Sequence, residues 1–97
     1  MRVRFDPAKD AKNIAERGLP FSLVEDLDWH TAIAREDRRK DYGERRILVL
    51  AYLGSRLHAA MVTYQNRAVH VISFRKAHWK EVDWYEQQKG RQDFPAG

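Results

Sequence analysis

The segment Tyr42-Gly43-Glu44-Arg45-Arg46 carries the side chains that acid–base chemistry at a phosphate requires. Glu44 can remove a proton, and the guanidinium groups of Arg45 and Arg46 can hold a phosphate beside it. Gly43 lets the backbone turn sharply or approach a ligand closely. The alternative is an exposed turn with a surface ion pair, which contributes little to stability. The segment therefore predicts either a reactive site or a solvated turn.

A second candidate site lies at Arg75 and Lys76, where an expected strand gives way to an expected helix. Two adjacent cations beside the N–H groups of a helix N-terminus form an anion-binding site. Cations are unfavourable at a helix start, so this pair costs helix stability unless it has another task. The alternative is that both side chains precede the helix and face water.

The four histidines do not form a metal site by spacing. They are His30, His58, His70 and His78, with no H-E-x-x-H pattern and no cysteine to complete a zinc site. No cofactor is therefore predicted. His58 and His70 lie on successive expected strands and alternate with apolar residues, which favours neighbouring, partly buried structural histidines over catalytic ones. Either can still titrate near neutral pH.

Four large aromatic residues offer a further possibility. Trp29, Trp79, Trp84 and Tyr85 can stack on nucleobases. In a small domain, however, such side chains more often close the core, and this interpretation is favoured for most of them.

These candidates need elements to position them. Val3–Phe5 alternates as a short strand, and Asp6 followed by Pro7 predicts the start of a helix that ends at Gly18. A second short helix is expected over Phe21–Leu27. Neither helix is long enough to be stable alone, so both must pack on something apolar. The apolar face expected in the first helix is Ala8, Ala11, Ile14 and Ala15.

The rest of the chain predicts a sheet and a last helix. The expected strands are Thr31–Ala34, Arg46–Leu53, Arg56–Tyr64 and Ala68–Phe74, and the helix is Ala77–Gln88. Tight turns join the last three strands, so this part of the sheet should be antiparallel. The predicted order is β-α-α-β-β-β-β-α, an α+β domain with helices on one side of a small, mostly antiparallel sheet.

Composition sets the limits on function. The 97 residues suffice for one domain, expected over residues 1–89, with a loose tail over 90–97. The net charge of +4 permits an anionic partner without requiring one. The absence of cysteine excludes a disulfide framework. No apolar run is long enough to span a bilayer, and the charged N-terminus does not fit a signal peptide, so we expect a cytoplasmic protein without membrane contact.

The densest charge lies in Arg35–Arg46, with six basic and four acidic residues. A nucleic-acid-binding tail of one sign would not carry so many carboxylates. The segment therefore predicts a solvated loop or strand end.

Three stretches carry a family pattern in a consistent order. The first is Phe5–Lys9 with Asn13, Gly18 and Phe21 after it, and the second is Asp41–Arg46, with its G-E-x-R. The third, Val71–Ala77 with Glu81 and Tyr85, reads I-S-x-R-[KR]-A-x-x-x-E-x-x-x-Y. Together they resemble the BrnT family, the toxin half of a bacterial type II toxin–antitoxin pair with a RelE-like ribonuclease fold. The resemblance runs from Phe5 to about Tyr85.

The chain departs from the family pattern at three places. Phe5 stands where the family often has tryptophan, and Arg17 stands before Gly18 where it often has histidine. His70 replaces an arginine that usually comes two residues before the I-S pair. A titratable group there would weaken phosphate binding or add an acid–base group.

The resemblance implies a ribosome-independent ribonuclease that needs no metal. Glu44 would be the base that activates the 2′-OH, and Arg75 would hold the phosphorane. Arg46 or Lys76 would supply a second cation, and His70 or Tyr85 the acid. The expected RNA contacts beside them are Arg45, Arg67 and His58.

The resemblance also implies a partner, a BrnA-like ribbon-helix-helix antitoxin. The toxin–antitoxin hetero-oligomer would bind promoter DNA through the antitoxin. Two rivals remain open: a non-catalytic nucleic-acid-binding module or degenerate toxin that keeps only its antitoxin contact, and an inert structural adaptor.

Overall fold

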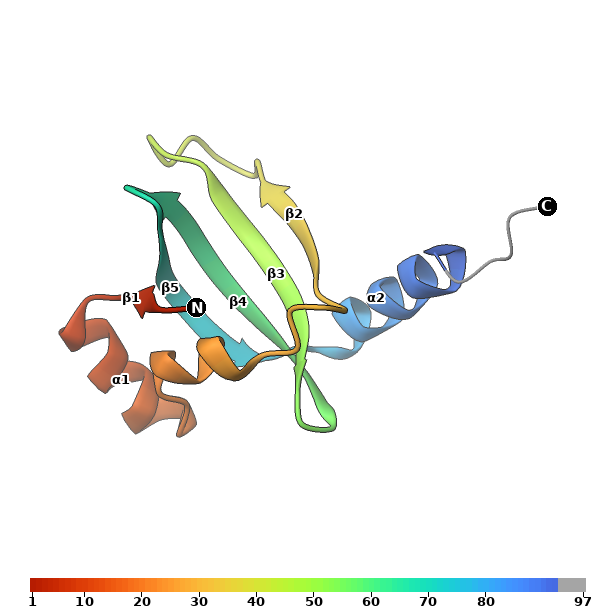
Figure 1. Ribbon diagram of the computed structural model, residues 1–97, viewed down its shortest axis with the longest axis horizontal. Helices are drawn as coiled ribbons and strands as arrows, with labels where there is room; N and C mark the ends of the chain where they lie inside the picture. Colours follow the sequence, from red (N-terminus) through yellow and green to blue (C-terminus); the bar gives the residue numbers. More distant parts are fainter. Residues whose placement is uncertain (93–97) are drawn as a thin grey trace.

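Five strands form one sheet in the order β1-β5-β4-β3-β2 in the computed structural model, which describes residues 1–92 (Figure 1). β1 runs parallel to β5, and every other neighbouring pair is antiparallel. The strands are β1 (Val3–Arg4), β2 (Ile33–Asp37), β3 (Arg46–Leu53), β4 (Arg56–Gln65) and β5 (Ala68–Lys76). The helices are α1 (Pro7–Arg17), the 3₁₀ helix η1 (Phe21–Asp26) and α2 (Trp79–Gln92). The predicted α+β class is confirmed. The element order differs slightly from the prediction, because a 3₁₀ helix stands where the second α-helix was expected.

Two tight hairpins build the centre of the sheet. Leu53 pairs with Arg56 across the first turn, and Gln65 pairs with Ala68 across the second. The β3 strand has the predicted bounds, and its middle residues 48–51 are all buried. β4 and β5 are one and two residues longer than predicted. The meander expected from the turn residues is therefore confirmed.

Helix α1 begins and ends where its caps predict. The side chain of Asp6 accepts a hydrogen bond from the Ala8 N–H at 2.9 Å. Gly18 takes the left-handed conformation, with φ 68°, and its N–H donates to the carbonyl of Ile14. The helix boundaries are confirmed.

The expected apolar face of α1 is wrong. Its alanines are exposed, Ile14 is 42% exposed, and the one buried residue of the helix is Asn13. The Asn13 amide donates to the carbonyls of Leu19 and Phe74 at 2.8 and 2.9 Å. Phe74 lies in β5, so Asn13 satisfies a strand carbonyl that would otherwise be buried without a partner. This polar requirement, and not the small alanines, fixes the docked face.

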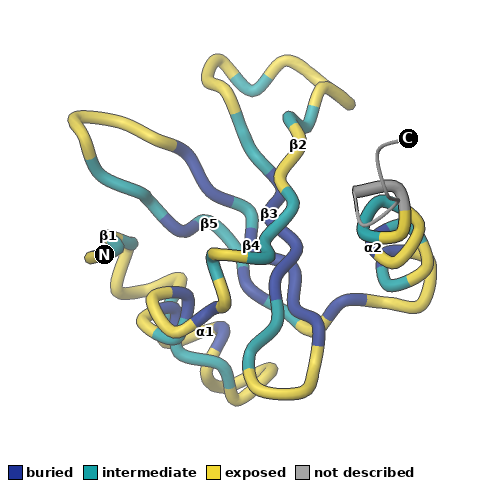
Figure 2. Tube along the Cα trace, turned by 45° about the vertical axis from the view of Figure 1, so that its right-hand side comes forward, coloured by how far each residue is buried: buried dark blue, intermediate teal, exposed yellow. Residues whose placement is uncertain are grey.

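The sheet carries a core on each face, so the prediction of helices on one side is wrong. Because side chains alternate along a strand, Val49 and Ala51 of β3 face one cluster, and Leu48 and Leu50 face the other. The first cluster packs under η1, and the second packs against α2. Figure 1 shows α1 at one side of the sheet and α2 leaving from the other, and Figure 2 shows the buried strand centres between them.

Strand β2 lies further along the chain than predicted. It extends into the charged segment, where Arg35 pairs with Leu48 and Asp37 pairs with Arg46. The charged segment therefore includes the end of a strand, one of the two predicted alternatives. An edge strand has only one neighbour and tolerates charged side chains, which also hinder pairing with another chain.

Helix α2 continues to Gln92, past Gly90 where the tail was expected to begin. Residues 93–97 of that expected tail lie outside the described residues. Neither α-helix within residues 1–92 is long and apolar enough to cross a membrane.

Candidate functional site

A cleft of about 640 Å³ opens on the face of the sheet that carries α2. Leu48, Leu50 and Met61 from β3 and β4 form its apolar floor, and Trp84 of α2 forms a wall. Five cations and three carboxylates surround the floor, so the lining is positive overall. The charged and titratable lining residues are Arg35, Glu36, Asp37, Arg38, Arg39, Arg75, His78, Lys80 and Glu81.

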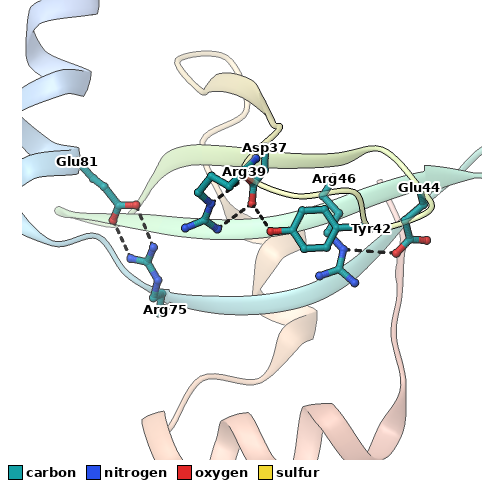
Figure 3. A network of polar contacts seen from close by, with 7 residues as sticks. All are labelled: Asp37, Arg39, Tyr42, Glu44, Arg46, Arg75 and Glu81. Carbon is teal, nitrogen blue, oxygen red and sulfur yellow. Dashed lines mark hydrogen bonds and ion pairs between the residues drawn. The ribbon is translucent and has the colours of Figure 1, made fainter.

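Arg75 lines this cleft and is held there by Glu81. Two parallel hydrogen bonds of 2.7 and 2.9 Å join its guanidinium to the carboxylate (Figure 3). A further N–H donates to the carbonyl of Lys76. A guanidinium has five N–H donors, so two remain for a ligand. A two-point contact of this kind fixes the orientation of the cation as well as its position.

Glu81 has a second task at the start of α2. Its carboxylate also accepts a hydrogen bond from the His78 N–H at 3.1 Å, as in a capping box. Burial alone would raise the pKa of Glu81. The hydrogen bonds from Arg75 and the His78 N–H outweigh it, so the pKa lies below the ordinary value of 4.5. Glu81 is therefore held as an anion that orients Arg75.

The imidazole of His78 lies beside this pair. Its Nε2 is 3.6 Å from Oε1 of Glu81, and its side chain is 56% exposed. A histidine at the mouth of a cationic cleft, next to a carboxylate, has the surroundings of an acid–base group.

Asp37 anchors the middle of the same face. It accepts two hydrogen bonds from the Arg39 side chain, one from the Arg39 N–H and one from the hydroxyl of Tyr42 (Figure 3). These bonds, the Arg39 side chain first, hold the pKa of Asp37 far below its usual range. Its lone pairs are occupied, so Asp37 positions Arg39 and is not a free base.

Glu44 and Arg46 lie at the other end of this face. The carboxylate of Glu44 accepts from the Gln65 amide at 3.0 Å and lies 3.5 Å from Nε of Arg46. This contact is not a hydrogen bond, so the buried Nε of Arg46 has no hydrogen-bond partner among the described residues. The guanidinium of Arg46 instead stacks on Tyr42, 4.2 Å from the ring centroid.

The structure does not bring Glu44 and Arg75 together. Arg75 pairs with Ala59 of β4, whereas the contact of Glu44 is to Gln65, six residues further along that strand. At about 3.4 Å per residue, these positions are roughly 20 Å apart. Figure 3 shows the two pairs at opposite ends of the face, with Arg39 between them. They cannot act on the same phosphate in this arrangement.

The remaining predicted cations are spread over the surface. Lys76 follows Arg75 by one residue on β5, so its side chain points to the other face of the sheet. Arg45 pairs with Glu36 at 3.2 Å and is largely exposed. Arg67 lies in the β4–β5 turn with a positive φ of 61°. None of the three lines the cleft.

The two strand histidines are not neighbours, so this prediction is wrong. His58 pairs with Lys76, and His70 pairs with Thr63 at the other end of the ladder. The register shifts by one residue at Ile72, because Met61 pairs with Ser73 but Val62 pairs with Val71. This bulge ends the simple alternation on which the prediction rested.

His58 and Tyr85 are core residues. His58 is 4% exposed, and its ring packs on Phe74 while Nδ1 contacts the carbonyl of Arg56. Tyr85 is 2% exposed and donates its hydroxyl to the carbonyl of Thr31 at 2.7 Å. His70 is partly buried beside Arg4 of β1, outside the cleft lining.

Sequence reasoning gave no role in the site to Arg35, Arg39, His78 or Glu81, although it named His78 among the histidines and Glu81 in the family pattern. One signal was available, because an acidic residue at the third position of a helix predicts a capping carboxylate. That carboxylate follows Arg75 by six residues. The cleft itself left no local signal, since its walls come from β2, β5 and α2. Within the described part of the chain, no three His, Asp or Glu side chains gather as a metal-binding group.

Comparison with known protein families assigns this chain to one family. Residues 5–81 match the family described as "Ribonuclease toxin, BrnT, of type II toxin-antitoxin system". The match covers most of the chain, so the protein belongs to the BrnT family. At the family level it is a ribonuclease toxin with an antitoxin partner and an RNA target. Neither the curated proteins nor the solved structures gave a match.

Proposed function

We propose that this protein cleaves RNA in the Arg75 cleft without a metal ion, and that a cognate antitoxin inhibits it. In the reaction, the 2′-oxygen forms a bond to the adjacent phosphorus and the bond to the 5′-oxygen breaks. The products are a 2′,3′-cyclic phosphate end and a 5′-hydroxyl end. One observation carries the proposal: a cation with free donors, fixed by a buried carboxylate, lies in a positive cleft.

Arg75 binds the phosphate and stabilises the charge that develops on it. Its two unused N–H donors can contact non-bridging oxygens while Glu81 keeps the guanidinium in place. The nearby cations Arg39 and Lys80 add positive potential to the cleft.

His78 takes the proton from the 2′-OH. The imidazolium that forms lies beside the carboxylate of Glu81, which stabilises it. A water at the open mouth of the cleft protonates the leaving 5′-oxygen. Glu44, expected from the family pattern to be the base, lies at the far end of the face, where Arg46, stacked on Tyr42, contributes to RNA binding.

The test is cleavage by purified protein in EDTA. Fragments with cyclic phosphate ends are expected, and Arg75→Ala should lower kcat by about 10²–10³-fold. Lys76→Ala is the matched control, because it removes the neighbouring cation from the other face and should leave kcat nearly unchanged. Growth of cells expressing each variant gives the same ranking. Salt-sensitive RNA binding without cleavage would instead support the non-catalytic alternative.

The antitoxin proposal follows from the same surface. A BrnA-like ribbon-helix-helix protein would lay an acidic segment over the positive cleft, beside the open edge of β2. The hetero-oligomer would then bind promoter DNA through the antitoxin. Arg38→Glu reverses a charge at the cleft and should weaken inhibition by the co-expressed antitoxin. Unchanged inhibition would place the antitoxin elsewhere.

A further inference from the structure

Part of the cleft has no use in phosphate chemistry. Phosphate binding requires cations and N–H donors, but Leu48, Met61 and Trp84 present apolar surface to the cleft. Met61 and Trp84 are only half-buried, so this surface faces the cavity. A concave site that combines apolar walls with a few polar groups is typical of a small organic ligand.

Trp84 and Arg35 form a flat, cationic wall of this cavity. The guanidinium carbon of Arg35 lies 4.8 Å from the centroid of the Trp84 ring. Arg35 is exposed and makes no ion pair with the described residues, in contrast to Arg39 and Arg75. Its hydrogen-bonding groups are therefore free, and its stacking surface is already aligned with an indole.

We infer that this wall binds a nucleobase, the one attached to the nucleotide whose phosphate contacts Arg75. The base stacks on Trp84 and displaces the exposed guanidinium of Arg35 outward, so that Arg35 stacks on the other side of the base, over the apolar floor of Leu48 and Met61. Aromatic and guanidinium planes are the usual partners of unstacked bases in single-stranded RNA. The inference rests on the proposed ribonuclease function and adds that the toxin senses the base as well as the backbone.

Trp79 provides the contrast that makes this assignment specific. It lies on the first turn of α2, is 73% exposed, and has the ammonium of Lys80 over its ring. It does not line the cleft. An exposed tryptophan on the same helix therefore serves as a matched control for Trp84.

Binding of small probes separates the base from the phosphate. We compare adenosine, guanosine, cytidine and uridine 5′-monophosphates with ribose 5-phosphate, which lacks the base. The wild-type protein should bind at least one nucleotide about 5- to 150-fold more tightly than ribose 5-phosphate, the range expected for one stacked base. Equal affinity for all five probes would overturn the inference.

Variants then locate the effect. Trp84→Leu keeps apolar volume but removes the flat ring. This variant should therefore bind nucleotides no more tightly than ribose 5-phosphate. Trp84→Phe should keep most of the nucleotide preference, and Trp79→Leu should keep it all. Thermal melts check that each variant is folded. A preference that survives in folded Trp84→Leu contradicts the assignment.

A readout in the wild-type protein covers the case in which Trp84→Leu does not fold. The indole N–H signal of Trp84 should shift in NMR spectra when the preferred nucleotide is added, while that of Trp79 should not. If the nucleotide binds to saturation and the Trp84 signal does not shift, the inference is overturned. Cleavage without nucleotide preference would refute only the base site, whereas nucleotide preference without cleavage would refute only the ribonuclease proposal.

Discussion

The two ends of the cleft face carry the same types of side chain in different surroundings. At one end, Glu81 is buried and accepts two hydrogen bonds from Arg75 inside the cleft. At the other, Glu44 is exposed and only approaches Arg46, outside the cleft lining. Both are glutamate–arginine pairs, but only the first fixes its cation.

Under the proposed mechanism, this contrast identifies the property of a charged pair that favours chemistry. A preorganised cation in a low-dielectric recess stabilises developing charge far better than an exposed one, because it does not have to reorient. The segment 35–46 has the highest density of charge in the chain. Many of its charged side chains, however, pair with each other, as Asp37 does with Arg39. Density of charge is therefore a weaker guide than the burial of its counter-ion.

Replacing one histidine at each end is the strongest way to break the comparison. His78→Ala removes the proposed base and should lower kcat by about 10²–10⁴-fold. His70→Ala should leave kcat close to wild type, because His70 lies outside the cleft lining. RNA cleavage rates across pH check both. A larger defect in His70→Ala would place the chemistry at the Glu44 end.

The second way is to test whether Glu81 acts through Arg75. Glu81→Gln keeps the shape of the side chain but removes the charge from a buried, hydrogen-bonded pair. It should cost about 1–3 kcal/mol of stability at neutral pH, and lower kcat with little change in KM. Chemical denaturation and steady-state kinetics measure the two effects. Glu16→Gln, at an exposed pair with Lys12, is the control and should be nearly neutral.

The pH dependence of that stability difference has a defined sign. The pKa of Glu81 is lower in the folded chain than the ordinary 4.5, so the folded state binds fewer protons on this group. The stabilisation is complete above pH 4.5 and is lost as the pH falls through the lowered pKa. The difference in the free energy of unfolding between wild type and Glu81→Gln should therefore become smaller as the pH falls below 4.5. If this difference in stability stays constant, the charge of Glu81 does not cause it.

A smaller effect is expected at the opposite end. Glu44→Gln should change KM for RNA by less than about fivefold and leave kcat unchanged, because exposed pairs contribute little. Initial rates over a range of RNA concentrations separate the two parameters. A fall of two orders of magnitude in kcat would restore the role of base that the family pattern gives to Glu44.

Local signals explain the parts of the fold that the sequence predicted. The cap at Asp6, the stop at Gly18 and the apolar run of β3 each act within a few residues, and the structure has all three where expected. The same holds for Arg75, whose place at the end of a strand follows from the strand itself. These features need no knowledge of what packs against them.

The failures all depend on distant parts of the chain. Asn13 is buried because the carbonyl of Phe74, 61 residues away, needs a donor. The bulge at Ile72 separates residues that plain alternation groups together. The cleft exists because β2 and α2 approach the same face, so no local pattern could place Arg35 or His78 beside Arg75.

The smallest expected effect concerns the β4–β5 turn. Asn66 and Arg67 both have positive φ, 52° and 61°, as in a two-residue turn that favours Asn-Gly. Arg67→Gly should therefore stabilise the fold by about 0.5–1 kcal/mol, because a side chain with a Cβ is strained there. Asn66→Gly should gain less, since asparagine tolerates this conformation. Thermal melts measure both.

Cleavage by Arg67→Gly should stay at the wild-type rate, because Arg67 does not line the cleft. A higher KM at unchanged kcat would extend the RNA-binding surface to this turn, as the sequence predicts, and would show that the strain is kept for a contact with the substrate.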